Sequence, residues 1–242
     1  MSFMENKTYL YQSSLSEAGR YDEIDMWRQS HYANIACKED IEKMIRRDFD
    51  GMNLKPECVT DIIQKYGFKR TGWVLANTIQ QLQYDGRFHP ENKAWAQGIF
   101  IPKSEANSSF IVTSHPAVLD GFVSQFLREM ENLHLFGREH CETLQQELEG
   151  KVLVMSPNTL KESYWAPENQ LWLATGGFGC NPNASGRAVY GICLSDGEQT
   201  RWNRHDFLGV IKDECLPDWA KQKLEEIRSP QPEPNKQDIT MG

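Results

Sequence analysis

The sequence has no long hydrophobic run: none of its apolar stretches approaches the roughly 18 residues that a membrane-spanning helix needs. Its first residues, MSFMENKTYLYQSS, lack the basic segment followed by an apolar stretch that marks a secretory signal. Positive charge is scarce too, since 26 Lys and Arg stand against 34 Asp and Glu, for a net charge of −8. These absences predict a cytoplasmic protein with no membrane partner. They disfavour nucleic-acid binding over the whole surface but leave room for a local basic patch.

Motifs of well-known enzymes are missing as well. A dinucleotide-binding loop needs the pattern G-x-G-x-x-G leading into a helix. Gly177 and Gly179 match its first two positions, but Pro182 stands at the third and turn residues follow. The P-loop pattern, the G-x-S-x-G elbow and the H-E-x-x-H helix do not occur. We therefore expect no catalytic residues and no cofactor, and interpret the glycines of residues 176–197 as tight turns.

Metal-binding patterns are equally scarce. The six cysteines are widely separated, no C-x-x-C occurs, and no paired Cys and His residues have the spacing of a structural zinc site. Scattered cysteines in a cytoplasmic chain are expected to be reduced and mostly buried. The sequence thus predicts no metal site.

The chain does have enough apolar residues for one large domain or two small ones, since 39% of its 242 residues are hydrophobic. Residues 114–133 carry the broadest apolar stripe and predict a helix, with Ser114 as its expected cap. Further helices are predicted over residues 37–49, 56–67 and 70–86, and short strands over 96–102 and 108–114.

The pattern changes after an acidic stretch at residues 136–150. Short segments rich in β-branched and aromatic residues predict strands, and Asp196-Gly197 predicts a tight hairpin. The predicted strands are residues 151–156, 170–175, 187–195 and 198–202, and a closing helix is predicted at 216–228. The predicted fold class is α+β, comprising an α-rich domain (1–135), an acidic connector (136–150), a small antiparallel β-rich domain with a C-terminal helix (151–228) and a disordered tail (229–242).

Two stretches are dense in side chains suited to recognition. The polar side chains of residues 77–93 indicate either a helix end tied together by local hydrogen bonds or a recognition surface. In the β-rich domain, aromatic residues lie among arginines, a combination that fills small cores and also binds single-stranded nucleic acid. The candidate nucleic-acid contacts are Arg187, Arg201, Trp202, Arg204 and His205.

Residues 31–51 and 72–96 resemble an uncharacterised domain family encoded on conjugative and integrative mobile elements of gut bacteria, and residues 171–210 resemble the C-terminal segment that the same proteins often carry. The stretches WVLANT and RWNRHDF are specific parts of the match. The family has no established activity, so the resemblance implies a genetic context and no catalytic or binding residue. Such elements carry accessory proteins, including inhibitors of restriction and CRISPR nucleases.

The leading hypothesis is a non-catalytic accessory protein of a mobile element that binds another protein, such as a host defence nuclease. An anti-CRISPR or anti-restriction protein of this kind would place carboxylates where the nuclease binds phosphates. The candidate contacts are Asp22, Glu23, Asp25, Glu142, Glu147 and Glu149. A nucleic-acid-binding module in the β-rich domain is the alternative hypothesis, and an enzyme of unrecognised type is the third.

Overall fold

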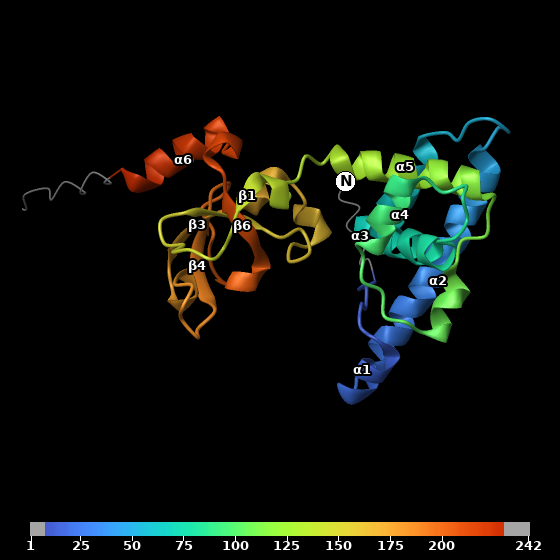
Figure 1. The fold of residues 1–242 in the computed structure, drawn as a ribbon, viewed down its shortest axis with the longest axis horizontal. Coiled ribbons are helices and arrows are strands. Elements are labelled where there is room, and N and C mark those ends of the chain that lie inside the picture. Colours follow the sequence, from blue (N-terminus) through green and yellow to red (C-terminus); the bar gives the residue numbers. More distant parts are fainter. Residues whose placement is uncertain (1–7, 230–242) are drawn as a thin grey trace, which may run out of the picture. The chain divides into compact units, whose positions relative to one another are not determined.

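The computed structural model describes residues 8–229, and the chain divides into two compact units, Met1–Asn132 (unit 1) and Leu133–Gly242 (unit 2). Unit 1 is helical, and unit 2 holds an antiparallel sheet followed by a closing helix (Figure 1). The predicted α+β class is therefore confirmed.

Unit 1 contains two long helices. Its elements are α1 (Leu15–Arg20), α2 (Ile24–Asp48), α3 (Glu57–Gln81), α4 (Pro90–Gln97), the 3-10 helix η1 (Glu105–Phe110) and α5 (Pro116–Glu131). The helix predicted at residues 37–49 is the second half of α2. Its first half was not predicted, because the first turns of α2 bury polar residues and show no apolar stripe. Gly67 separates two helices within α3, as predicted, since its φ of 83° and ψ of 165° are not helical.

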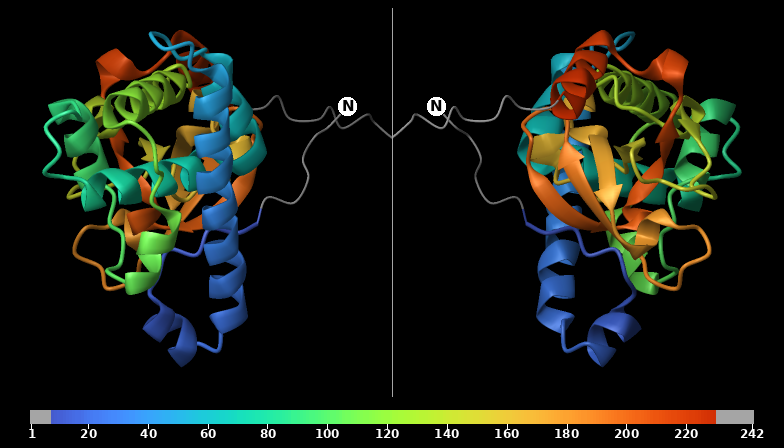
Figure 2. Two further views of the ribbon diagram at one scale, coloured as in Figure 1. Left: turned by 90° about the vertical axis from the view of Figure 1, so that its right-hand side faces the viewer. Right: turned by 90° about the vertical axis from the view of Figure 1, so that its left-hand side faces the viewer.

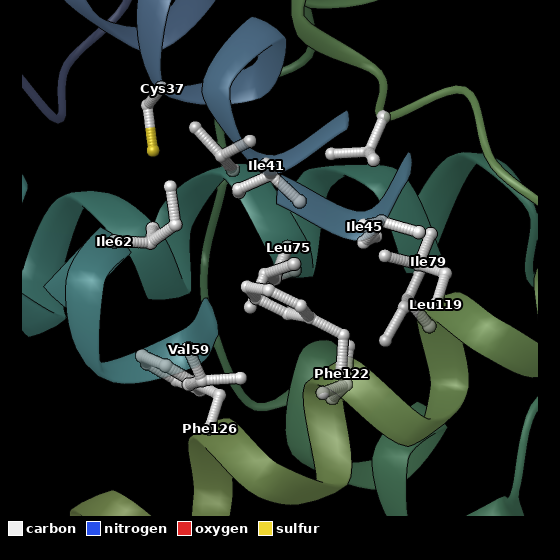
Figure 3. Close-up of a cluster of buried hydrophobic side chains, with 14 of the residues drawn as sticks. Cys37, Ile41, Ile45, Val59, Ile62, Leu75, Ile79, Leu119, Phe122 and Phe126 are labelled. Carbon is white, nitrogen blue, oxygen red and sulfur yellow. The ribbon is translucent and has the colours of Figure 1, made fainter. Parts of the chain in front are cut away.

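The core of unit 1 lies between α2, α3 and α5 (Figure 3). The stripe predicted on α5 is confirmed, with Leu119, Phe122 and Phe126 fully buried. Ser114 is not the cap of this helix: His115 holds that position without a side-chain hydrogen bond, and Pro116 begins the helix. The other labelled core residues of Figure 3 are Cys37, Ile41, Ile45, Val59, Ile62, Leu75 and Ile79.

The two strands predicted at residues 96–102 and 108–114 are wrong. The first segment ends α4 and continues as a loop, and the second begins in η1. Side chains of α3 take the place of a strand partner here. Gln80 donates to the carbonyl oxygens of Ala96 and Ile99 at 2.7 and 2.8 Å, and Thr78 Oγ1 accepts from the Val112 amide at 3.0 Å. Apolar residues in this loop therefore pack on helices.

Unit 2 is built on a six-stranded antiparallel sheet with the order β1-β6-β2-β3-β4-β5. Its elements are β1 (Cys141–Glu142), β2 (Val152–Met155), β3 (Leu171–Gly176), β4 (Ala188–Cys193), β5 (Gln199–Asn203), β6 (Phe207–Ile211) and α6 (Asp218–Arg228). The four predicted strands, the hairpin at Asp196-Gly197 and the closing helix are confirmed, and β1 and β6 are additional.

Apolar side chains cover both faces of the sheet. One face packs Leu153, Trp172 and Val189 into a cluster, and the other packs Val154 and Leu171 with residues of α6. The segment expected to connect the domains, residues 136–150, contains β1 and the fully buried Leu148 of the first cluster. The structure therefore assigns it to unit 2. Of the predicted tail, 229–242, all but Ser229 lies outside the described residues.

Candidate interaction surfaces

The N-terminal part of unit 1 forms a helical hairpin, called here the α1–α2 tip (residues 14–28). Ser14 begins α1 with a capping box: its hydroxyl accepts from the Glu17 amide at 3.2 Å, and Glu17 accepts from the Ser14 amide at 2.9 Å. Asp22 adopts a positive φ of 58° and turns the chain into α2. Figure 2 shows α1 at one end of α2, against which it packs.

The chain before the tip is fastened along α2. The buried guanidinium of Arg70 donates to the carbonyl oxygens of Thr8, Tyr9 and Ser30 at 2.8–3.0 Å. The Tyr11 hydroxyl donates to Glu23 at 2.7 Å, and this hydrogen bond raises the pKa of Tyr11 to about 12. These bonds give the tip a defined structure although few of its side chains are buried.

Large apolar side chains are concentrated on and beside this tip. Of thirteen exposed large hydrophobic residues among residues 8–229, six lie between Tyr9 and Tyr32. Tyr21 is 72% exposed and Met26 46%. Leu15 and Ile24 are the other exposed apolar residues of the tip. Solvent-exposed apolar groups that gather in one place, rather than singly, mark surfaces that bind other molecules.

Two of the three predicted acidic contacts on the tip are free to meet a partner. Asp22 is exposed, and Asp25 is exposed with a single surface ion pair to Arg28 at 3.0 Å. Glu23 is only half-exposed and already accepts the Tyr11 hydroxyl, so its carboxylate supports the hairpin. The tip therefore combines apolar side chains with two available carboxylates.

Part of the polar stretch at residues 77–93 serves the interior of unit 1. Asn77 donates to the carbonyl oxygen of Asn107 at 3.0 Å. Buried Asn92 donates to the Asp120 side chain at 2.8 Å and to Ser124 Oγ at 3.0 Å, which joins α4 to α5. Asn77 and Asn92 are therefore scaffold residues, although their bonds reach distant segments and are not local, whereas Gln81, Arg87 and His89 of the same stretch are exposed.

A small cavity in unit 1 lies where the tip meets η1. Its volume is about 30 Å³, which holds one water molecule or two and no metabolite. His31 lines it, stacked on Trp27 with ring centroids 4.8 Å apart, and burial lowers the pKa of this histidine. Ser109 Oγ lies 3.2 Å from His31 Nε2. The arrangement packs the tip against η1.

In unit 2, the β4–β5 hairpin brings three of the predicted nucleic-acid contacts together. Arg187, Arg201 and Trp202 line one shallow groove of about 360 Å³ with Ala188 and Asn203. Trp202 is half-buried and its ring packs edge-on against Trp172, with centroids 5.2 Å apart. The indole is thus part of the core cluster and is not an open stacking platform.

Arg204 is buried and does not face solvent. Its guanidinium donates to the carbonyl oxygens of Gly179, Leu144 and Gln146, the last at 3.0 Å, and burial lowers its pKa. It therefore fastens the loops at residues 144–146 and 179 to the sheet and cannot contact a phosphate. His205 is exposed in the following turn, where its amide donates to Asn203 Oδ1 at 3.0 Å.

Two aromatic residues that lie among these arginines in the sequence, but were not among the five candidate contacts, are exposed in the structure. Phe178 is 78% exposed and Tyr190 is 51% exposed, and Tyr190 lies opposite Arg201 in the β4–β5 register. The alternation along β4, with Val189 and Gly191 buried on either side of Tyr190, was the available signal. This alternation predicts an exposed Tyr190 only once the pairing register of β4 and β5 is known.

The remaining predicted acidic contacts lie in unit 2. Glu142, Glu147 and Glu149 are all exposed. Buried Leu148 stands between the last two, and within residues 136–150 the structure exposes no large hydrophobic side chain. These carboxylates therefore lack the apolar neighbours that Asp22 and Asp25 have.

A protein-family model described as "Protein of unknown function (DUF3849)" matches residues 10–131, half of the chain. The chain belongs to this family. No curated protein and no solved structure matches it. The DUF3849 match coincides with the described helices of unit 1 and includes the α1–α2 tip, whereas unit 2 lies beyond it.

Two further properties of this DUF3849 protein concern the described residues alone. Between residues 8 and 229, no three His, Cys, Asp or Glu side chains are grouped closely enough to hold a metal ion. In the same range, no helix combines the length and apolar character needed to cross a membrane.

Proposed function

We propose that this protein is a non-catalytic binding protein whose DUF3849 region docks on another protein through the α1–α2 tip. The observation that carries the proposal is the gathering of exposed Leu15, Tyr21, Ile24 and Met26 beside the carboxylates of Asp22 and Asp25. A central apolar anchor surrounded by charged groups is the usual composition of an energetically important part of a protein interface.

The apolar residues of the tip would supply part of the free energy of such a contact. Complete burial of one fully exposed large apolar side chain contributes roughly 1.5–3 kcal/mol. Four side chains that are about half exposed would together contribute about 3–6 kcal/mol. Because the tip is already held by Arg70 and Tyr11, little conformational entropy is lost when it binds.

The carboxylates indicate the chemistry of the partner. Asp22 and Asp25 favour a partner surface on which basic groups surround an apolar depression. The nucleic-acid channel of a nuclease has such basic groups, and a family encoded on mobile elements has use for an inhibitor of host defence nucleases. Host CRISPR and restriction nucleases are therefore the first partners to be tested, and the corresponding role would be anti-CRISPR or anti-restriction.

The test is a pull-down of the tagged full-length protein from host lysate, with nuclease added to half of the samples, followed by affinity measurement with the purified partner. We expect a stoichiometric protein partner that survives nuclease treatment. Tyr21→Ser combined with Met26→Ser should weaken its binding by about 30-fold, corresponding to about 2 kcal/mol. The matched control is Met52→Ser with Tyr84→Ser, which removes the same exposed side-chain types elsewhere in unit 1 and should bind normally.

A second pair of variants tests the charge. Asp22→Asn with Asp25→Asn should slow association and reduce its salt dependence, because asparagine keeps the positive φ at position 22 while removing the charge. Glu147→Gln with Glu149→Gln is the control and should leave association unchanged. Equal loss of binding in the tip variants and their controls, or capture that disappears on nuclease treatment, would refute the proposal.

A further inference from the structure

The strand β5 forms one edge of the sheet in unit 2 and leaves backbone groups unpaired. Natural sheets protect their edges with very short strands, charged side chains, proline, bulges or covering segments. The opposite edge, β1, is only two residues long, but β5 has five residues, contains no proline and pairs with β4 in continuous register. Arg201 is the one charged side chain on β5, and an edge of this length with so little protection is a template for another strand.

The hairpin geometry identifies the unpaired groups. The Cys193 amide donates to the Glu198 carbonyl at 2.9 Å, so Glu198 belongs to a hydrogen-bonded pair of the hairpin. Every second residue of β5 after Glu198 therefore directs its amide and carbonyl toward β4. Thr200 and Trp202 are at these positions, and Gln199 and Arg201 consequently direct theirs away from the sheet. Outside the strand ladder, no backbone hydrogen bond of the turns and loops within residues 8–229 reaches the amide or carbonyl of Gln199 or Arg201. At Asn203 the amide is already bonded to Asp206 Oδ2 at 2.7 Å.

Positive charge lies beside this edge. Arg187 and Arg201 are exposed and line the groove along β5, and neither forms an ion pair with an acidic residue of the described chain. In a protein of net charge −8, two unpaired arginines at one groove are complementary to a negatively charged ligand. Exposed Tyr190, opposite Arg201, adds an apolar contact on one face of the hairpin.

We propose that β5 binds an extended, acidic peptide segment of a partner protein by strand addition. Two amides and two carbonyls, from Gln199 and Arg201, would bond the peptide backbone, and its acidic side chains would meet Arg187 and Arg201. This surface is separate from the α1–α2 tip, and the inference does not depend on the function proposed for that tip.

A peptide fits these groups better than a nucleic acid does. The outward groups alternate between donors and acceptors, which a peptide backbone satisfies, whereas a phosphodiester offers acceptors alone and would leave both carbonyls unpaired. Burial of Arg204 and packing of the Trp202 ring also remove two of the five contacts expected for a nucleic-acid surface. Both facts favour strand addition at this groove.

The experiment is a titration of the isotope-labelled full-length protein with an acidic peptide of about ten residues that alternates glutamate and threonine. Amide hydrogen exchange is followed by NMR. The peptide should slow exchange at Gln199 and Arg201 on the order of tenfold, while Thr200 and Trp202, already bonded to β4, change little. The comparison ligands are the same peptide with lysine in place of glutamate and a single-stranded oligothymidylate.

Matched variants separate backbone recognition from charge. Gln199→Pro removes one outward amide at an edge position that tolerates proline, and should weaken peptide binding about fivefold, the effect of one lost hydrogen bond. Gln199→Ala keeps that amide and should bind normally. Arg187→Gln with Arg201→Gln should weaken binding further and flatten its salt dependence, whereas Lys161→Gln with Lys223→Gln, of equal charge change on exposed lysines, should not.

Three results would overturn the inference. One is peptide binding without protection of the Gln199 and Arg201 amides, and another is absence of acidic-peptide binding at millimolar concentration. The third is binding of oligothymidylate in preference to the peptide, which would assign the groove to nucleic acid. Tyr21→Ser with Met26→Ser should leave peptide binding unchanged, so this result and the test of the α1–α2 tip remain independent.

Discussion

Replacing Arg204 should lower the stability of unit 2, because this buried side chain supports the fold and is not part of a binding surface. Arg204→Met keeps much of the aliphatic volume of the side chain. It removes the guanidinium, and with it the hydrogen bonds to the carbonyl oxygens of Gly179, Leu144 and Gln146. Among residues 8–229, no carboxylate forms a salt bridge with this guanidinium, so the three carbonyls are what compensates its burial.

The expected loss is large for a small domain. The carbonyl oxygens of Gly179 and Gln146 would lose their donor at a cost of about 1–3 kcal/mol each, whereas the Leu144 carbonyl keeps the Gln146 amide at 2.7 Å; relief of the desolvated charge offsets part of this total. We expect a net destabilisation of about 2–4 kcal/mol, against a typical domain stability of about 5–15 kcal/mol. Arg204→Lys should lose about half as much, because a single ammonium group replaces a planar fork that serves carbonyls on two separate loops.

Hydrogen exchange measured by mass spectrometry provides the assay, because it reports each unit separately in the full-length protein. Peptides from residues 133–229 should exchange faster in Arg204→Met, and those from residues 8–132 should not. The control is Arg201→Met, which removes an exposed arginine from the neighbouring strand and should change stability by less than about 0.5 kcal/mol. Equal stability of the two variants would refute the structural role assigned to Arg204.

Two further predictions concern unit 1. Arg70→Met should release the segment before the α1–α2 tip, because the carbonyl oxygens of Thr8, Tyr9 and Ser30 lose their common donor. Amide exchange in residues 8–14 should then become faster, corresponding to a loss of about 2–4 kcal/mol in local stability. Unchanged exchange would contradict this. The Tyr11 phenol must be neutral to donate to Glu23, so its raised pKa of about 12 stabilises the tip fully below the ordinary tyrosine value of about 10. That stabilisation should be lost as pH rises from about 10 to about 12, and an absorbance titration should show a tyrosine ionising near pH 12 that is absent from Tyr11→Phe.

Local patterns were enough to predict much of the fold. Strands β2 to β5 combine β-branched and aromatic residues with clear turn signals, and α5 has a regular apolar stripe, so neighbouring residues alone indicate these elements. The strand β6 was missed because Gly209 interrupts its apolar run. A Cβ at Gly209 would collide with the backbone of β1, so this glycine permits close approach between strands and does not mark a turn.

The sites were harder to predict because burial depends on contacts between distant residues. Arg201 and Arg204 look equivalent in the sequence, but strand register exposes the first while the loop carbonyls enclose the second. The start of α2 was missed for a similar reason. Ser30 and Asn34 are buried there because Arg70, forty and thirty-six residues away, bonds to them. Neither pairing leaves a periodic signal in the sequence.

The strand order of unit 2 has a consequence for synthesis on the ribosome. The last strand to be made, β6, lies between β1 and β2, the first two. The sheet therefore cannot close until residues 207–211 have left the exit tunnel, and until then β2 exposes an edge made entirely of buried-type side chains. All contacts within residues 8–132 are available earlier, so unit 1 can fold during translation while unit 2 waits for chain completion. A truncation just before Phe207 would remove the middle of the sheet rather than trim its end.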